Sequence, residues 1–430
     1  MVAQNRRPDR PQRGPGRDYA LLFGNNLIFF TGVNLVSAMT ILPVFVSHLT
    51  ESAVIVGMVP AMVQLSFSLP QIAGPSIFAD KRIKKNWLAT TNAIGALAFA
   101  LFGLLVLTVG DTNPTLLLVT FFPALIMLHG SAGIGATGWV DILGKIIARR
   151  VRGRFFGAST ATGGLLGAAG LAVASGLLGD DAFPRGYGTL IAVAGLMICA
   201  GSLLFLPLRE PPSPDPDDSD RLFWRTMRKI PRVLVEDRGF LYYAGARVIV
   251  AWAMAAGAFI AVFGARDLGA TDSDVARLTT VFLLSQVTGS LSGGWFGDRF
   301  GVRYLPVLGS LATVVAVSLA FSATDLTLIY AAVGMAGMAS MVIVADITIV
   351  LERAPDLCRP TYMAGLNLIL GPLALPAPLL LGRLVDVAGF HTMFGTTIVV
   401  ALAGLLAVLG FAFGPGRKLA SRAPAQTGPG

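Results

Sequence analysis

The chain alternates between long apolar stretches and short polar breaks along almost its whole length. A helix that crosses a membrane needs about 20 mostly apolar residues, and twelve stretches are long enough. These stretches cover residues 19–47, 53–79, 87–109, 115–147, 155–178, 187–208, 240–264, 275–297, 303–322, 326–351, 360–385 and 391–413. They are continuous apolar runs, whereas the strands of a membrane β-barrel alternate apolar and polar residues. The pattern therefore predicts an all-α membrane protein with twelve transmembrane helices.

The composition agrees with this prediction. Of the 430 residues, 54% are hydrophobic and 13% are charged, and the mean hydropathy is +0.71. Soluble globular proteins carry about 25% charged residues, so an ordinary soluble enzyme is excluded. Two cysteines and three histidines exclude a disulfide framework and a histidine-rich metal site. In a membrane protein, a net charge of +9 reflects basic loops on one side, and we expect no nucleic-acid partner.

Basic residues mark the side of the membrane on which the ends of the chain lie. Of the 33 Lys and Arg residues, 27 fall on the side of the two termini, and three fall on the opposite side. Loops rich in Lys and Arg stay in the cytoplasm. An even number of crossings also places both termini on one side. We therefore expect a multi-pass protein of the plasma (inner) membrane with cytoplasmic N- and C-termini.

A polar segment at mid-chain divides the twelve stretches into two sets of six. Residues 209–220 are rich in proline and aspartate, and residues 221–238 mix apolar and basic side chains, as in helices that lie on a membrane surface. We expect five regions. These are a disordered arm at 1–18, a six-helix bundle at 19–208, a linker with an amphipathic segment at 209–239, a second six-helix bundle at 240–414 and a tail at 415–430.

Three landmarks recur in the same order in both halves, which indicates an internal repeat. The pairs are Asp80 and Asp298, 218 residues apart, Arg152 and Arg359, 207 apart, and Gly186 and Gly389, 203 apart. The loop after the eighth stretch also carries a signature of glycine, aspartate and arginine. Its residues are Gly293, Asp298, Arg299, Gly301 and Arg303, and the loop after the second stretch keeps Asp80 and Arg82 of that signature.

This signature, within two six-span repeats, resembles the major facilitator superfamily over residues 18–414. The resemblance implies two pseudo-symmetric bundles, with spans 1, 4, 7 and 10 around a central cavity and spans 3, 6, 9 and 12 facing lipid. The fourth span has the superfamily's glycine spacing, but His129 stands where the motif has an arginine. Glycines of span five loosely resemble an exporter motif; they are Gly157, Gly163, Gly164, Gly167 and Gly170.

Five ionisable side chains fall inside predicted spans 4, 7 and 10, where each charge costs about 2.5–3.5 kcal/mol on insertion scales. They are His129, Asp141, Lys145, Arg247 and Asp346. No Lys or Arg lies within one helical turn of Asp346, so it is the best candidate for a group that takes and releases a proton. The alternative is a structural carboxylate paired with Arg247 from another helix.

The other four have equally open roles. Asp141 and Lys145 are four residues apart on one helical face, which favours a local ion pair. Arg247 either binds an anionic group of a substrate or neutralises Asp346, and we favour the pair. His129 either titrates near neutral pH or fills space as a hydrogen-bonded core residue, which is the commoner case.

Polar and aromatic side chains within the spans are candidates for the lining of the cavity. They are Asn26, Asn34, Ser37, Gln64, Trp139, Trp252, Gln286 and Asn367. The alternative is that they join helices to one another, because Asn and Ser also hydrogen-bond between membrane helices.

The loop motifs suggest a gate on the cytoplasmic side. An aspartate at the end of a span can lie against the positive N-terminus of a helix in the other half. By the resemblance, Asp80 would face the start of span 11 and Asp298 the start of span 5. The gating candidates are Asp80, Arg82, Arg152, Gly293, Asp298, Arg299, Arg303 and Arg359. Surface anchoring is the alternative.

These features predict a secondary transporter that works by alternating access. The sequence has no phosphate-binding loop of the type Gly-x4-Gly-Lys-Ser/Thr and no catalytic cluster, so we expect no ATP hydrolysis, no enzyme activity and no cofactor. The expected partners are a small-molecule substrate, protons and the lipid bilayer, and we expect a monomer. A cavity poor in charge favours export of amphipathic compounds. The alternatives are a proton-coupled or facilitative importer and a membrane sensor or assembly protein without transport.

Overall fold

The computed structural model describes residues 16–78, 81–147, 151–178, 183–212, 237–354 and 359–413, in which all regular secondary structure is helical. The first half contains α1 (Arg17–Leu35), α2 (Ile41–Leu49), α3 (Ala53–Phe78), α4 (Lys85–Val109), α5 (Pro114–Ile146), α6 (Arg152–Leu178) and α7 (Arg185–Leu203). The second half contains α9 (Arg238–Met254), α10 (Gly257–Asp267), α11 (Asp272–Phe300), the 3₁₀ turn η2 (Val302–Tyr304), α12 (Leu305–Phe321), α13 (Leu326–Met338), α14 (Met341–Arg353), α15 (Arg359–Ala374) and α16 (Pro376–Phe413).

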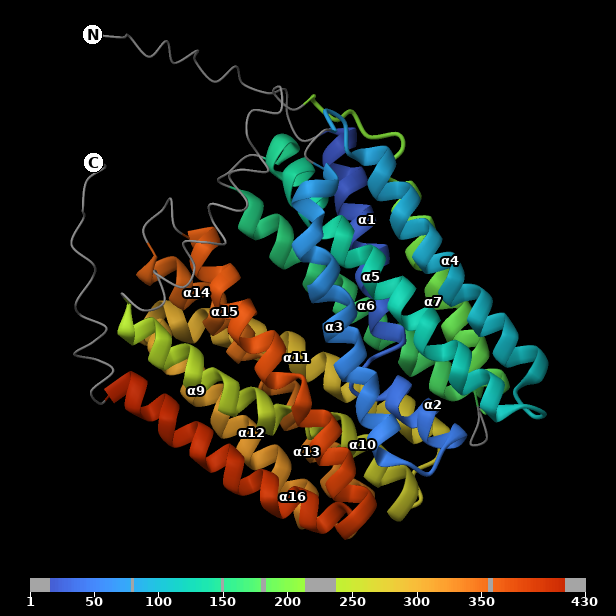
Figure 1. Ribbon diagram of the computed structural model, residues 1–430, viewed down its shortest axis with the longest axis vertical. Helices are drawn as coiled ribbons and strands as arrows, with labels where there is room; N and C mark the ends of the chain where they lie inside the picture. Colours follow the sequence, from blue (N-terminus) through green and yellow to red (C-terminus); the bar gives the residue numbers. More distant parts are fainter. Residues whose placement is uncertain are drawn as a thin grey trace.

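The helices form two bundles that lie side by side, one from each half of the chain (Figure 1). We call the face at which α1 begins and α16 ends the terminal face, and the face near α2 and α10 the distal face. The ribbons of the two bundles meet near the distal face and diverge toward the terminal face (Figure 1). Two long contacts join the bundles, α6 with α11 and α3 with α16.

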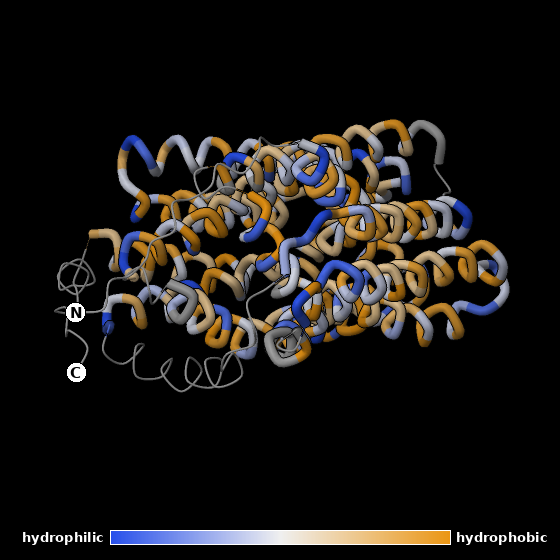
Figure 2. The backbone as a smooth tube through the Cα atoms, turned by 90° about the horizontal axis from the view of Figure 1, so that it is seen from above, coloured by the Kyte–Doolittle hydropathy of each residue, from blue (hydrophilic) through white to orange (hydrophobic). Residues whose placement is uncertain are grey.

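The twelve predicted crossings can be traced through the described helices. Nine stretches are long and apolar enough to span a membrane, and the last of them, Tyr362–Phe413, contains two crossings that turn at Gly389 (φ 80°). Two further crossings are more polar. One is α1 with α2, and the other is α11, which carries aspartates and arginines at both ends. The hydrophilic stretches gather toward helix ends and loops (Figure 2), as a bilayer requires.

Spans 3, 6, 9 and 12 present apolar side chains to the outside, as the resemblance implied. In α4 the exposed positions are Ile94, Leu97, Leu101 and Leu104, which share one helical face because they are three or four residues apart. In water such a stripe would be a costly exposed patch, whereas lipid tails cover it without penalty. On its other face α4 packs closely on α7. A Cβ atom on Gly103 would lie 2.4 Å from the backbone nitrogen of Ala192.

Four of the crossings are broken near their middle, although the sequence pattern predicted continuous helices. Span 1 is interrupted between α1 and α2, span 7 at Ala255-Ala256, span 10 at Ala339-Ser340 and span 11 at Leu375. Irregular backbone at membrane depth needs protein or a water-filled cavity to satisfy its polar groups. The apolar pattern did not reveal the breaks because residues that also suit a continuous membrane helix, such as Ala255, Ala339 and Leu375, occupy them.

In each half, one buried carboxylate joins helices to one another at the terminal face. Glu210 accepts hydrogen bonds from the backbone nitrogens of Lys84 and Lys85 at the start of α4, at 2.7 and 2.8 Å. In the second half, Asp237 caps α9 through the nitrogen of Phe240 and pairs with Arg353 of α14. A carboxylate at a helix N-terminus accepts hydrogen bonds from the free backbone N–H groups and interacts favourably with the helix dipole. Each contact stays within one half.

Candidate substrate cavity and gate

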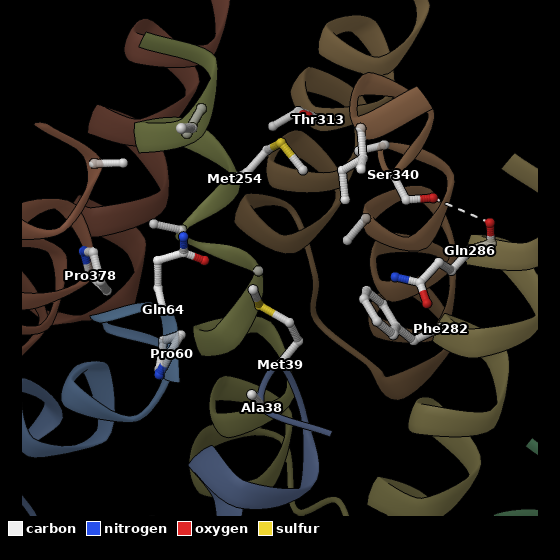
Figure 3. Close-up of a pocket in the computed structure, with 18 of the residues that line it drawn as sticks. Ala38, Met39, Pro60, Gln64, Met254, Phe282, Gln286, Thr313, Ser340 and Pro378 are labelled. Atoms are coloured by element: carbon white, nitrogen blue, oxygen red, sulfur yellow. Dashed lines mark hydrogen bonds between the residues drawn. The ribbon is translucent and has the colours of Figure 1, made fainter. Parts of the chain in front are cut away.

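A cavity of about 450 Å³ lies between the two halves, within the size range of sites that enclose small molecules. All four helix breaks contribute to its wall, through Met39, Ala255, Ser340 and Leu375 among others. The interrupted backbone is therefore where a membrane protein tolerates it, beside a cavity. Figure 3 shows Gln64 of α3 and Gln286 of α11 on opposite sides of this space.

Four of the eight predicted cavity residues line it. They are Asn34, Ser37, Gln64 and Gln286. The Gln64 side chain donates a hydrogen bond to Ser68 at 3.0 Å, and the backbone oxygen of Gln286 accepts one from the Ser340 hydroxyl at 3.2 Å (Figure 3). Most of the remaining wall is apolar, with Met39, Met254 and Phe282 among its larger side chains.

The other four predicted residues lie outside the cavity. Asn26 is buried and donates to the Ser159 hydroxyl at 3.1 Å, which joins α1 to α6. Trp139 packs in an apolar cluster around α5, and Asn367 is exposed on α15. Trp252 donates to the backbone oxygen of Leu373 at 2.7 Å, next to the break in span 11. Hydrogen bonding between helices, the alternative weighed above, accounts for Asn26 and Trp252.

One ion pair lies at the cavity wall and joins span 7 to span 10. Nε of Arg247 in α9 donates to both carboxylate oxygens of Asp346 in α14 at 3.0 Å. The hydroxyl of Tyr243, one helical turn before Arg247, donates to the same carboxylate at 2.6 Å. Arg247 is 7% and Asp346 6% exposed. The pair that we favoured from the sequence is therefore formed, and Asp346 has a partner in this conformation.

Breaking this pair on one side is expected to destabilise the protein by about 3–5 kcal/mol, because the remaining charge is left buried without compensation. Arg247→Gln and Asp346→Asn should each lower the free energy of unfolding in detergent, and the double variant should recover most of the loss. If the double variant loses the sum of the two single losses, the side chains do not act as a pair.

The remaining ionisable candidates do not reach the cavity. Asp141 and Lys145 form the expected local pair at 2.8 Å, and Lys84 binds the same carboxylate at 2.9 Å. Lys145 also contacts Glu210 at 2.6 Å, so this network belongs to the terminal face of the first half. His129 is partly exposed on α5 and is not among the lining residues.

The predicted gate at the terminal face is only partly covered by the described residues. Asp298 is exposed, and within the described residues it has neither a hydrogen bond nor an ion pair. Arg303 instead lies over the ring of Tyr304, and Arg299 lies near the ring of Phe300. Arg82 is exposed, and buried Gly293 lets Met341 approach α11. Asp80 and the side chains of Arg152 and Arg359 lie outside the described residues.

The distal face carries the same chemistry instead. Asp386 in α16 accepts hydrogen bonds from the backbone nitrogens of Ala53 and Val54 at 2.6 and 3.3 Å. It therefore caps α3, a helix of the other half. Arg266 at the end of α10 donates to the backbone oxygens of Thr50 and Glu51 at 2.6 and 3.0 Å, at the C-terminal end of α2, where a cation is favourable.

A second carboxylate completes this set of contacts. Asp272, the first residue of α11, binds three groups of the first half. These are the ring of His48 at 3.0 Å, the hydroxyl of Tyr187 at 2.7 Å and the backbone nitrogen of Phe183 at 3.1 Å. We call Arg266, Asp272 and Asp386 with their partners the distal latch. Nearby, the hydroxyl oxygens of buried Thr40 and Thr279 lie 2.7 Å apart across the halves.

The contacts at the distal face were not predicted from the sequence. The signal for Asp386 and Asp272 was available, since each is an aspartate at the end of a span. Nothing in the sequence says which helix N-terminus lies opposite, because that depends on how the halves meet.

The comparisons with known proteins agree with this architecture. The sequence model of the Major Facilitator Superfamily matches residues 244–429, the second half of the chain. The second half of the chain is therefore similar in sequence to the major facilitator superfamily. No curated protein matches the sequence.

Solved structures of transporters share the superfamily fold over nearly the whole chain. A point mutant of the nucleoside transporter NupG superposes with a TM-score of 0.70 at 11% identity, covering 92% of this chain and 99% of that one. A D-xylose–proton symporter gives 0.64 at 16%, covering 92% and 96%. A bacterial homolog of the human lysosomal transporter Spinster, inward-facing and unoccupied, gives 0.59 at 17%, covering 95% and 99%.

One expectation drawn from the superfamily does not fit this conformation. Spans 1, 7 and 10 line the cavity as implied, but no described residue of α5, which is span 4, is among the lining residues. Span 4 is also the one of these four that is continuous.

Proposed function

We propose that the protein transports small amphipathic molecules by alternating access between its two halves, coupled to protons through Asp346. The Arg247–Asp346 pair at the wall of the central cavity carries this proposal. The charge of a buried carboxylate can be neutralised in two ways, by an ion pair with the arginine or by binding a proton. A transporter can use that choice to link protons to substrate.

The arrangement of contacts supports the mechanical part of the proposal. The hydrogen bonds of the distal latch join the two halves at the distal face, whereas those of Glu210 and Asp237 at the terminal face stay within one half. With the terminal face in the cytoplasm, as the basic residues suggest, this conformation is the inward-open one. The exposed Asp298 would then engage in the opposite conformation.

Two directions of transport each have an observation in their favour. The mainly apolar wall of the cavity suits the export of amphipathic compounds. The only charged side chain among the described lining residues is Arg247, which favours uptake of an anion together with a proton.

An accumulation assay in an efflux-deficient bacterial host tests the proposal. The cells carry the wild type, Asp346→Asn, Glu352→Gln or an empty vector, and receive a mixed panel of drugs and metabolites with or without a protonophore. Glu352 is the matched control, because it is an exposed carboxylate on the same helix as Asp346. The wild type and the control should change the accumulation of at least one compound, whereas Asp346→Asn and the protonophore should abolish that change.

Each outcome has one meaning. A lower accumulation than with the vector indicates export, and a higher one indicates uptake. If Asp346→Asn behaves as the wild type does, Asp346 is not in the coupling path. If no compound distinguishes the wild type from the vector, transport is contradicted, and the sensor or assembly role gains support.

A further inference from the structure

The charge that a ligand meets in the cavity is positive. Arg247 lines the cavity, whereas its partners Asp346 and Tyr243 are not among the lining residues. Asn34 and Gln286 contribute uncharged amides to the same wall. A cationic ligand would therefore encounter a guanidinium before any carboxylate, and that order disfavours it.

The guanidinium of Arg247 is not fully used by the protein. Its Nε serves both oxygens of Asp346, while Nη1 is buried and has no hydrogen-bond acceptor within the described residues. Arginine has five N–H donors in a planar fork that matches carboxylate and phosphate oxygens. A buried donor without an acceptor is unfavourable, and an anionic group that enters from the cavity would satisfy it.

We propose that the cavity takes small molecules with an apolar body and one anionic group, and that this group displaces Asp346 from Arg247 so that Asp346 binds a proton. This inference rests on the proposed function and names its substrate class. The steps balance in charge. The ion pair of Arg247 with Asp346 breaks, a new pair forms between Arg247 and the ligand anion, and the Asp346 carboxylate takes one proton from water. The site has no net charge before or after, as a buried site requires.

Asp346 is the group in a position to receive this proton. The charged and titratable side chains that act on it within the described helices are Arg247 and Tyr243, both from α9. The described parts of α11, α12 and α15, which also pack against α14, add none. Tyr243 already donates its hydroxyl hydrogen to Asp346. Once Arg247 turns to the ligand, protonation is the way for the buried carboxylate to remain uncharged.

Proton and anion therefore bind together and leave together. In a transporter, both then move in the same direction. An inward proton gradient would drive uptake of the anion. A ligand that competed with the proton for Asp346 would instead exchange with it.

The test uses purified protein and pairs of compounds that differ in one group. The pairs are hexanoate and hexanamide, octanoate and octanamide, cinnamate and cinnamamide, and phenylbutyrate and phenylbutyramide. Binding is measured by the ligand-induced rise in melting temperature and by calorimetry. At least one acid should bind tighter than its own amide by about tenfold or more. Arg247→Gln should remove this preference, and Arg238→Gln, at an exposed position on the same helix, should keep it.

Asp346→Asn separates the proposed role from a structural one. Without a competing carboxylate, Arg247 is free for the ligand, so this variant should bind the acids more tightly than the wild type. In weakly buffered solution with a pH indicator, the wild type and Glu352→Gln should take up about one proton per acid bound, and Asp346→Asn none. A merely structural Asp346 predicts weaker binding in the variant. A variant that does not fold would not bind the acids. Tighter binding by Asp346→Asn without proton uptake would therefore also show that this variant is folded.

The proposal is overturned if no acid binds better than its amide, or if acids bind to the wild type without proton uptake. These failures differ from a failure of the transport proposal. If cells move neutral or cationic compounds while acids have no advantage in binding, transport stands and the anion site falls. If acids bind with a proton but no compound is moved in cells, the site stands and transport falls.

Discussion

Alanine in place of Gly57 or Gly382 is expected to hold the distal face open and to stop transport. Gly57 of α3 and Gly382 of α16 lie where the two halves touch most closely. A Cβ atom on Gly57 would lie 2.3 Å from the backbone oxygen of Pro378, and one on Gly382 would lie 2.4 Å from that of Ala53. Both neighbours are backbone atoms, so closing the face would require the helices to move apart. Overpacking of this kind costs about 1–3 kcal/mol.

The measurement is the rate at which a buried thiol reacts from the distal side. Thr279→Cys, on a background without Cys199 and Cys358, places the thiol at a fully buried position between the halves. With a membrane-impermeant reagent, Gly57→Ala and Gly382→Ala should raise the labelling rate on the order of tenfold. Gly245→Ala is the matched control, because nothing lies within 4 Å of its added Cβ atom. Equal rates in all variants would contradict a tight closure at this contact.

Removing the carboxylate of Asp386 is the second change with a large expected effect. Asp386→Ala takes the cap from α3 and breaks a contact between the halves. Loss of a helix cap costs about 0.5–2 kcal/mol. Because this cap exists only while the distal face is closed, the loss weakens closure itself. The labelling rate of the same thiol should rise about fivefold.

Asp325 provides a control with matched chemistry. It also caps a helix at the distal face, through the nitrogens of Thr327 and Leu328 at 2.8 and 3.2 Å. That helix, α13, is in the same half as Asp325, so Asp325→Ala should lower stability without opening the distal face. If both variants raise the labelling rate equally, the effect is a general loss of stability, and Asp386 does not hold the distal face closed.

The sequence predicted the parts of this structure that depend on local pattern. Long apolar runs predict membrane helices, because the backbone polar groups of each crossing must be hydrogen-bonded within the helix. The exposed apolar stripe on α4 was predictable because this span contains no charged side chain. The Asp141–Lys145 pair follows from a spacing of four residues.

The parts that depend on how the halves meet were not predictable in the same way. Asp386 and Asp298 are both aspartates at the ends of spans, but within the described residues Asp386 contacts the other half and Asp298 does not. The breaks beside the cavity fall at Ala255 and Ala339, which also suit an unbroken helix. Trp252 and Asn367 carry side chains typical of a binding site, but they lie on the wrong faces of their helices.

The central claim is that the two faces open in alternation around the Arg247–Asp346 pair. Distances between pairs of spin labels in lipid test this directly. One pair, at positions 86 and 352, reports on the terminal face, and the other, at 111 and 324, reports on the distal face; all four residues are exposed. We expect two populations, such that a shorter distance at one face accompanies a longer distance at the other, and a different balance of the two populations in Asp346→Asn. A single unchanging distance at both faces, in the wild type and the variant alike, would contradict this claim.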